Sequence, residues 1–195
     1  MNGFVSFLRY TGIFAAVLAW VIIGLCVVIN PWFKLTVNAF SDLGGPRATD
    51  PYLYNVGLIV VALFTALYGS YLVYLSQNKV ETVSATLVII AAIFLALIGV
   101  YHEGTYPHVF VSTWFFIQFD MAVLVNGLSL LFASRDLGIL MIFLFLIATV
   151  VAATVHWPSA ATIEAWGIGC IDVWIILSYF RVRQIMNLGG SPRRR

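Results

Sequence analysis

The chain has 195 residues, of which 62% are apolar and only 9% are charged, with a formal net charge of +2. A soluble domain is typically about 45–50% apolar and about 25% charged. This composition excludes a soluble enzyme, a nucleic-acid-binding module and a disordered chain, because too few charged residues remain to cover a surface exposed to water. It indicates that lipid solvates most of the surface.

Six apolar stretches are long enough to cross a membrane as helices, because about 20 apolar residues span a bilayer core of about 30 Å. They fall at approximately residues 12–30, 54–76, 82–101, 109–132, 137–155 and 160–180. The strands of a transmembrane barrel alternate apolar and polar residues, which residues 138–145 do not do. We therefore predict an all-α fold, a six-helix transmembrane bundle that forms a single domain over residues 1–195.

Basic residues are distributed unequally between the two sides of these predicted helices. One side carries only Lys34 and Arg47, and the other carries Arg9, Lys79, Arg135, Arg181, Arg183 and Arg193–Arg195. Loops rich in Lys and Arg stay in the cytoplasm. We therefore predict a multi-pass protein of the cytoplasmic (plasma) membrane with both termini in the cytoplasm.

All three histidines and four of the eight acidic residues fall on the predicted outer side. Because imidazole and carboxylate groups bind zinc and similar divalent ions, His102, His108 and His156 are candidate metal ligands. Their convergence requires that the bundle bring together the ends of the third, fourth and sixth helices. The alternative is that these polar side chains simply occupy loops that lie in water.

Two carboxylates lie deeper, since Asp120 and Asp172 are each about 12 residues, or about 18 Å, inside a predicted helix. A carboxylate at the middle of a bilayer is costly, so both should face the interior of the bundle. Each is either a functional acid or a polar contact between helices. Either carboxylate could be protonated, or could accept a hydrogen bond from a neighbour such as Gln118, Asn126 or Ser129.

Two glycines follow Glu164 in the last predicted helix. Small residues on a transmembrane helix let a second helix approach closely. We therefore expect Gly167 and Gly169 to serve helix packing.

Several outer segments carry a resemblance to a known family. They are Phe40–Gly45, Tyr54–Ile59, Gly99–Gly104, His108 with Phe115 and Phe116, and Glu164 with Trp174. Together they resemble domain of unknown function 998, whose members are six-helix membrane proteins of archaea and bacteria. The resemblance implies this fold and a polar outer cluster of Ser41, Asp42, Glu103, His108 and Glu164, but no established reaction. In that family a proline is commoner at the position of His102, and the pattern calls for neither His102 nor His156.

We expect a pocket open to the outer leaflet that binds a lipid headgroup or an ion. Its predicted lining is Ser41, Asp42, Glu103, His108 and Glu164, with Asp120 and Asp172 beneath. In an enzymatic version, a divalent metal such as zinc activates water to hydrolyse a lipid-like ester or amide. Asp42 or Glu103 would then be the catalytic base.

Two alternatives remain open at the sequence level. The protein could bind lipid without catalysis or serve as an accessory subunit of a larger membrane complex. A proton-coupled transporter that uses Asp120 and Asp172 is a third class, although the sequence shows no inverted repeat or broken helix. Membrane lipids are the expected partners in the leading hypotheses, and nucleic acid is not expected.

Overall fold

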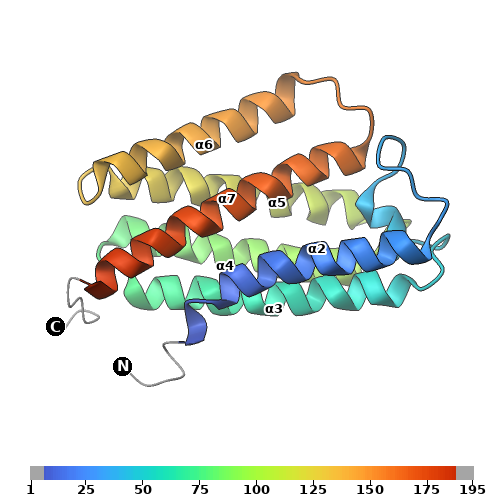
Figure 1. The fold of residues 1–195 in the computed structure, drawn as a ribbon, viewed down its shortest axis with the longest axis horizontal. Coiled ribbons are helices and arrows are strands. Elements are labelled where there is room, and N and C mark those ends of the chain that lie inside the picture. The colour runs from blue at the N-terminus through green and yellow to red at the C-terminus, as the bar shows by residue number, and fades with distance from the viewer. Residues whose placement is uncertain (1–6, 188–195) are drawn as a thin grey trace.

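A computed structural model describes residues 7–187 and shows an antiparallel bundle of helices (Figure 1). The described part contains no strand. Its elements are α2 (Thr11–Ile29), the short 3-10 helix η1 (Phe40–Gly44), α3 (Pro51–Leu75), α4 (Lys79–Val100), α5 (His108–Leu130), α6 (Arg135–Thr154) and α7 (Ala160–Asn187). Apart from η1, these are the six predicted helices, so the predicted fold class is confirmed.

The predicted boundaries are close to the observed ones except at the end of α7. All six helices begin within three residues of the predicted position, whereas α7 continues seven residues beyond residue 180. Hydropathy does not detect this extension because the segment after Phe180 is polar. The extension nevertheless packs on the bundle, since Val182 and Ile185 are buried and Val182 lies in a small apolar cluster with Tyr71 and Leu75.

Each helix packs mainly against its neighbours in sequence, and α7 returns to contact α2. From α3 onward, short connections favour this order, because a turn of a few residues places the next helix antiparallel beside the last. Large aromatic side chains fill the interior. Phe119 of α5 and Tyr68 of α3 both pack against the fully buried Trp174 of α7, with ring centroids 5.2 and 6.2 Å away.

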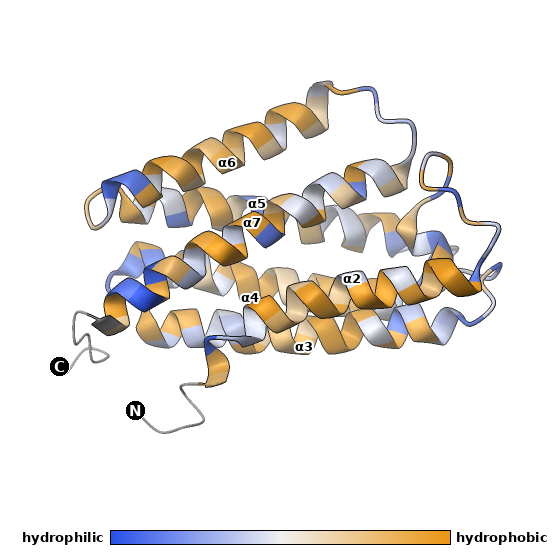
Figure 2. Cartoon of the chain, viewed as in Figure 1, coloured by the Kyte–Doolittle hydropathy of each residue, from blue (hydrophilic) through white to orange (hydrophobic). Residues whose placement is uncertain are grey.

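Hydrophobic residues predominate along the helices, and hydrophilic residues gather mainly near the helix ends and in the loops (Figure 2). All six helices are long and apolar enough to cross a membrane. Many large apolar side chains are exposed, among them Phe14, Leu63 and Phe143. Exposure of this surface to water would be unfavourable, whereas in a bilayer the lipid chains solvate it. The chain is therefore a multi-pass membrane protein.

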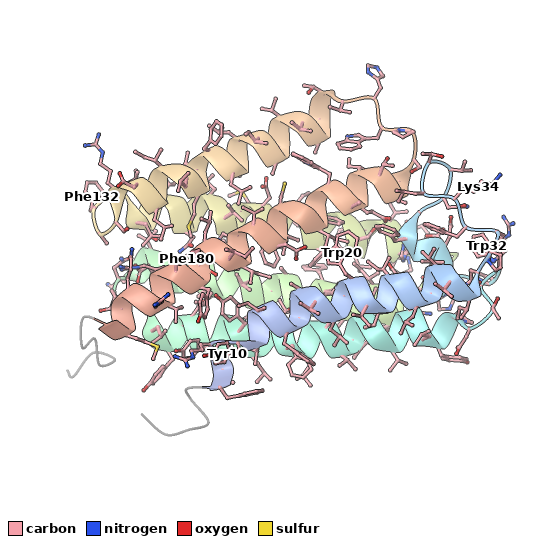
Figure 3. All side chains as sticks on the ribbon, in the orientation of Figure 1. Tyr10, Trp20, Trp32, Lys34, Phe132 and Phe180 are labelled. Atoms are coloured by element: carbon pink, nitrogen blue, oxygen red, sulfur yellow. The ribbon has the colours of Figure 1, made fainter. Side chains whose placement is uncertain are left out.

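The two ends of the bundle differ. The start of α2 and the end of α7 lie at one end, where an ion pair of 3.2 Å joins Arg181 of α7 to Glu81 of α4 (Figure 1). The long α2–α3 loop with η1 lies at the opposite end, called here the η1 end. Trp32 and Lys34 lie at the η1 end, far from Phe132 (Figure 3). Arg193–Arg195, which contribute to the predicted orientation, lie outside the described residues, and the orientation itself stays a prediction.

The α2–α3 loop folds back over the η1 end because buried amides hold it there. Asn30 is fully buried, donates to the carbonyl of Cys26 at 2.8 Å and accepts from the backbone N–H of Thr49 at 2.8 Å. Asn55 of α3 donates to the carbonyl of Gly44 at 2.9 Å. The same side chain lies so close to Gly44 that a β-carbon there would collide with it. These contacts fix η1 on top of the bundle.

Candidate polar site and cavities

Two acidic side chains position η1. The Oδ2 atom of Asp42 accepts the backbone N–H of Ala39 at 2.9 Å and so caps η1 from within the loop. The Oε2 atom of Glu164, on α7, accepts the backbone N–H of Phe40 at 2.7 Å. A side chain of α7 therefore binds the first amide of η1, which lies 124 residues earlier in the sequence.

Three predicted site residues meet at a single oxygen. The Oε2 atom of Glu103 lies 3.0 Å from Nε2 of His108 and accepts the hydroxyl of Ser41 at 3.3 Å. The other ring nitrogen of His108, Nδ1, lies 2.8 Å from the carbonyl oxygen of Tyr101. Since a carbonyl only accepts hydrogen bonds, Nδ1 carries a proton. Nε2 faces the Glu103 carboxylate.

This arrangement differs from a nucleophile activated by histidine. Such a site places the hydroxyl against the imidazole, which removes its proton. Here the hydroxyl of Ser41 and the imidazole of His108 both contact the carboxylate of Glu103. The group therefore links the α2–α3 loop, the α4–α5 loop and the start of α5.

The structure does not gather the three predicted metal-binding histidines into a ligand set. His102 bonds through Nδ1 to the backbone carbonyl of Glu103 at 2.9 Å, and His156 is exposed in the α6–α7 loop. Over residues 7–187, no group of three or more His, Cys, Asp or Glu side chains is placed to hold a metal ion. The metal site and the metal-assisted hydrolysis stay predictions without a ligand set in the described part of the chain.

The two deep carboxylates are half-buried and bond to other helices. Trp20 of α2, labelled in Figure 3, donates its indole N–H to Oδ2 of Asp172 on α7 at 2.7 Å. Thr149 of α6 donates its hydroxyl to Oδ2 of Asp120 on α5 at 2.8 Å.

The expected partners of Asp120 within α5 are wrong. Helix geometry explains this, because only residues three or four positions apart share a helix face. Gln118, Asn126 and Ser129 stand two, six and nine positions from Asp120. Asn126 instead accepts the indole N–H of Trp174 at 3.3 Å.

A cavity of about 530 Å³ lies between α5, α6 and α7. Its wall is mainly apolar, with aromatic side chains and small alanines on facing helices. Asp120, Thr149 and Glu164 are among its few polar lining residues. This cavity is a mainly apolar space with carboxylates in its wall.

A smaller cavity of about 90 Å³ lies in the centre of the bundle, lined by residues of α2, α3, α4, α5, α7 and η1. Ser41 lines it from η1, and Glu164 and Asp172 line it from α7. The two cavities share five lining residues: Ser112, Phe116, Phe119, Glu164 and Ile171. They are therefore adjacent, and Glu164 stands in the wall of both.

The predicted site residues thus separate into two groups. Ser41, Asp120, Glu164 and Asp172 line a cavity, whereas Asp42, Glu103 and His108 line neither and hold the loops at the η1 end.

Sequence reasoning missed Ser112 and Thr149. Ser112 stands one helical turn after His108, so helical spacing could have indicated it. Thr149 is one polar residue in an apolar stretch, and its role depends on the packing of α6 against α5.

The family model "Protein of unknown function (DUF998)" matches residues 13–181. This range includes η1, the cavities and nearly all of the six helices. No match to the chain was found among curated proteins or among solved structures. Because the match covers well over half of the sequence, the resemblance seen in the outer segments is confirmed, and the chain belongs to the DUF998 family of membrane proteins.

Proposed function

We propose that this protein binds a membrane amphiphile, with the apolar part of the ligand in the larger cavity and its polar part at Glu164. The observation that carries the proposal is the cavity of about 530 Å³ between α5, α6 and α7. Small-molecule sites usually measure about 300–1,000 Å³ and are mostly apolar with a few polar groups. The cavity has this size and this composition.

The volume favours a lipid-like molecule over a partner helix. A transmembrane helix is about 10 Å across and about 30 Å long, so it would need several times this space. A single apolar chain fits, because it is narrow and flexible. The proposed partners are therefore lipids of the cytoplasmic membrane, and the accessory-subunit alternative becomes an outcome of the test.

The polar lining supports a position of the ligand head near the η1 end. Glu164 and Ser112 each stand four residues after the first residue of their helix, which is about 6 Å along the axis. This depth corresponds to the boundary between lipid headgroups and acyl chains. The deeper wall is apolar apart from Asp120, Thr149 and Cys170.

Filling the cavity tests the proposal. Ala148 lines it from α6, so Ala148→Phe should lower the amount of lipid that remains bound to the purified protein by about tenfold or more. Val150 lies on the same helix, is exposed and does not line the cavity, so Val150→Phe is the matched control and should retain lipid. Native mass spectrometry of protein released from detergent measures the bound lipid.

Three outcomes distinguish the remaining alternatives. Equal lipid retention by both variants would contradict binding in this cavity. Recovery of hydrolysed ester or amide products with the wild type, and of intact lipid with Glu103→Gln, would favour the predicted hydrolase. Absence of bound lipid from the wild type, together with a defined stoichiometric protein partner, would favour the accessory subunit.

A further inference from the structure

We infer that the ligand is a cationic amphiphile, a protonated amine on an apolar body, whose ammonium group binds Glu164. This inference rests on the proposed binding function and names the chemical class of its ligand. It follows from the charge of the cavity walls, from the hydrogen bonds that their carboxylates lack and from the aromatic lining.

The cavity walls carry acidic groups without basic ones. Glu164 lines both cavities, Asp120 lines the larger and Asp172 lines the smaller. No Lys, Arg or His of residues 7–187 lines either cavity. In a medium of low dielectric constant, this arrangement attracts a cation and repels the phosphate or carboxylate of an anionic lipid.

Each of these carboxylates is also incompletely bonded. Glu164, Asp120 and Asp172 each accept one hydrogen bond, and in each the donor contacts only one oxygen, Oε2 or Oδ2. Within the described part of the chain, the second oxygen of each has no donor. A carboxylate removed from water needs several donors or a positive charge. An ammonium group supplies three N–H donors together with that charge.

Glu164 is the carboxylate best placed for the ammonium group. It stands one turn inside α7, near the η1 end, where a polar head can remain close to water. Asp120 lies deeper, because it stands eight residues, or about 12 Å, further along α5 than Ser112, which lines the cavity near the η1 end. Asp120 therefore adds negative potential along the path of the apolar chain.

Aromatic side chains in the wall suit the same ligand. Phe116 and Phe119 line both cavities, and Trp166 lines the larger one. The faces of aromatic rings attract ammonium groups at distances of about 6 Å or less, and the attraction grows when water is excluded. The same rings pack against an apolar chain. From these rings, a neutral or anionic head would gain no cation–π attraction, and only the apolar chain would make favourable contacts.

Three ligands of equal chain length test the inference: dodecylamine, 1-dodecanol and dodecanoic acid. They compete for the protein at equal concentration in one detergent sample near neutral pH, and native mass spectrometry measures the bound fraction of each. We expect the amine to occupy the protein about tenfold more than the alcohol, because hydrogen bonds between charged groups are stronger than neutral ones. The acid should bind least.

Single substitutions test whether the preference for the amine arises from the carboxylates of the cavity wall. Glu164→Gln keeps an acceptor for the Phe40 amide but loses the charge, so the amine should bind no better than the alcohol. Asp136 lies in the first turn of α6 and lines neither cavity, so Asp136→Asn should keep the full preference. If Glu164→Gln does not fold, Asp120→Asn replaces it and should lower the preference severalfold.

The outcomes separate this inference from the proposed function. Equal binding of the three ligands, or tighter binding of the acid, would overturn the cationic ligand and leave amphiphile binding intact. An amine preference that is unchanged in a folded Glu164→Gln variant, or in Asp120→Asn where that variant replaces it, would also overturn it. Failure of all three ligands to bind a wild type that also retains no lipid would refute both proposals.

Discussion

His108 is almost fully buried, and both of its ring nitrogens have partners, the carbonyl of Tyr101 and the carboxylate of Glu103. Removal of either member of the Glu103–His108 pair leaves a polar group in the loop region without its partner. We expect Glu103→Ala and His108→Ala each to lower the free energy of unfolding. In a double-mutant cycle their coupling should be about 1–3 kcal/mol. Equilibrium unfolding in mixed detergent micelles measures it.

His102 provides the control for this prediction. It stands in the same loop but bonds only to the backbone carbonyl of the next residue, Glu103. His102→Ala should therefore change the free energy of unfolding by about 0.5 kcal/mol or less. A coupling near zero between Glu103 and His108, or a larger effect at His102, would contradict the assignment of the pair as a link between loops.

The contacts between these residues could not be predicted from the sequence. Residue type and position near a predicted helix end make Glu103 and His108 candidates, and the family resemblance makes Ser41 one. Their meeting at one oxygen could not be predicted, because Ser41 and Glu103 are 62 residues apart. Likewise, nothing local to Asp172 indicates Trp20, which is 152 residues away. Hydropathy locates helices, whereas these partners depend on which helix faces meet.

The contribution of glycines to helix packing is also only partly predictable from the sequence. The expectation that Gly167 allows close packing is confirmed, because a β-carbon there would lie 2.6 Å from the ring of Phe116 on α5. The expectation for Gly169 is wrong, because nothing lies within 4 Å of its β-carbon position. The two glycines are two positions apart and so point to different sides of α7. Spacing alone does not tell which side is packed.

At the α3–α4 contact, Gly99 lies against the backbone of Asn55. A β-carbon at Gly99 would collide with the Asn55 carbonyl oxygen, and a backbone atom within a helix cannot move aside as a side chain can. We expect Gly99→Ala to lower the free energy of unfolding by about 1–3 kcal/mol through this overpacking. The effect should exceed the gain in helix propensity, which is about 1 kcal/mol. Unfolding in mixed micelles again provides the measurement.

Gly169→Ala is the matched substitution for this test. Its β-carbon would enter open space, so only the gain in helix propensity applies and stability should stay the same or rise slightly. If both alanines destabilise the protein equally, glycine in these helices serves something other than close approach. If neither does, α3 and α4 pack less tightly than the structure shows.

Across the whole molecule, the two ends of the bundle differ in their polar groups and in what those groups contact. At the η1 end, carboxylates and amides hold loops over cavities with acidic walls. The opposite end carries the Glu81–Arg181 ion pair and a short polar turn between α3 and α4. The positions of Lys79, Arg135 and Arg181 at this second end make it the predicted cytoplasmic side. The η1 end then opens toward the outer leaflet, from which the ligand would enter.

Two exposed loop residues allow this orientation to be tested. Tyr106 lies between α4 and α5 at the η1 end, and Phe132 lies between α5 and α6 at the other end; both are almost fully exposed. Each is replaced by cysteine in a chain whose Cys26 and Cys170 are alanine. In intact cells, a membrane-impermeant maleimide should label Tyr106→Cys, and it should label Phe132→Cys only after lysis. The reverse pattern would place the cavities on the cytoplasmic side, and the ligand would then come from the inner leaflet.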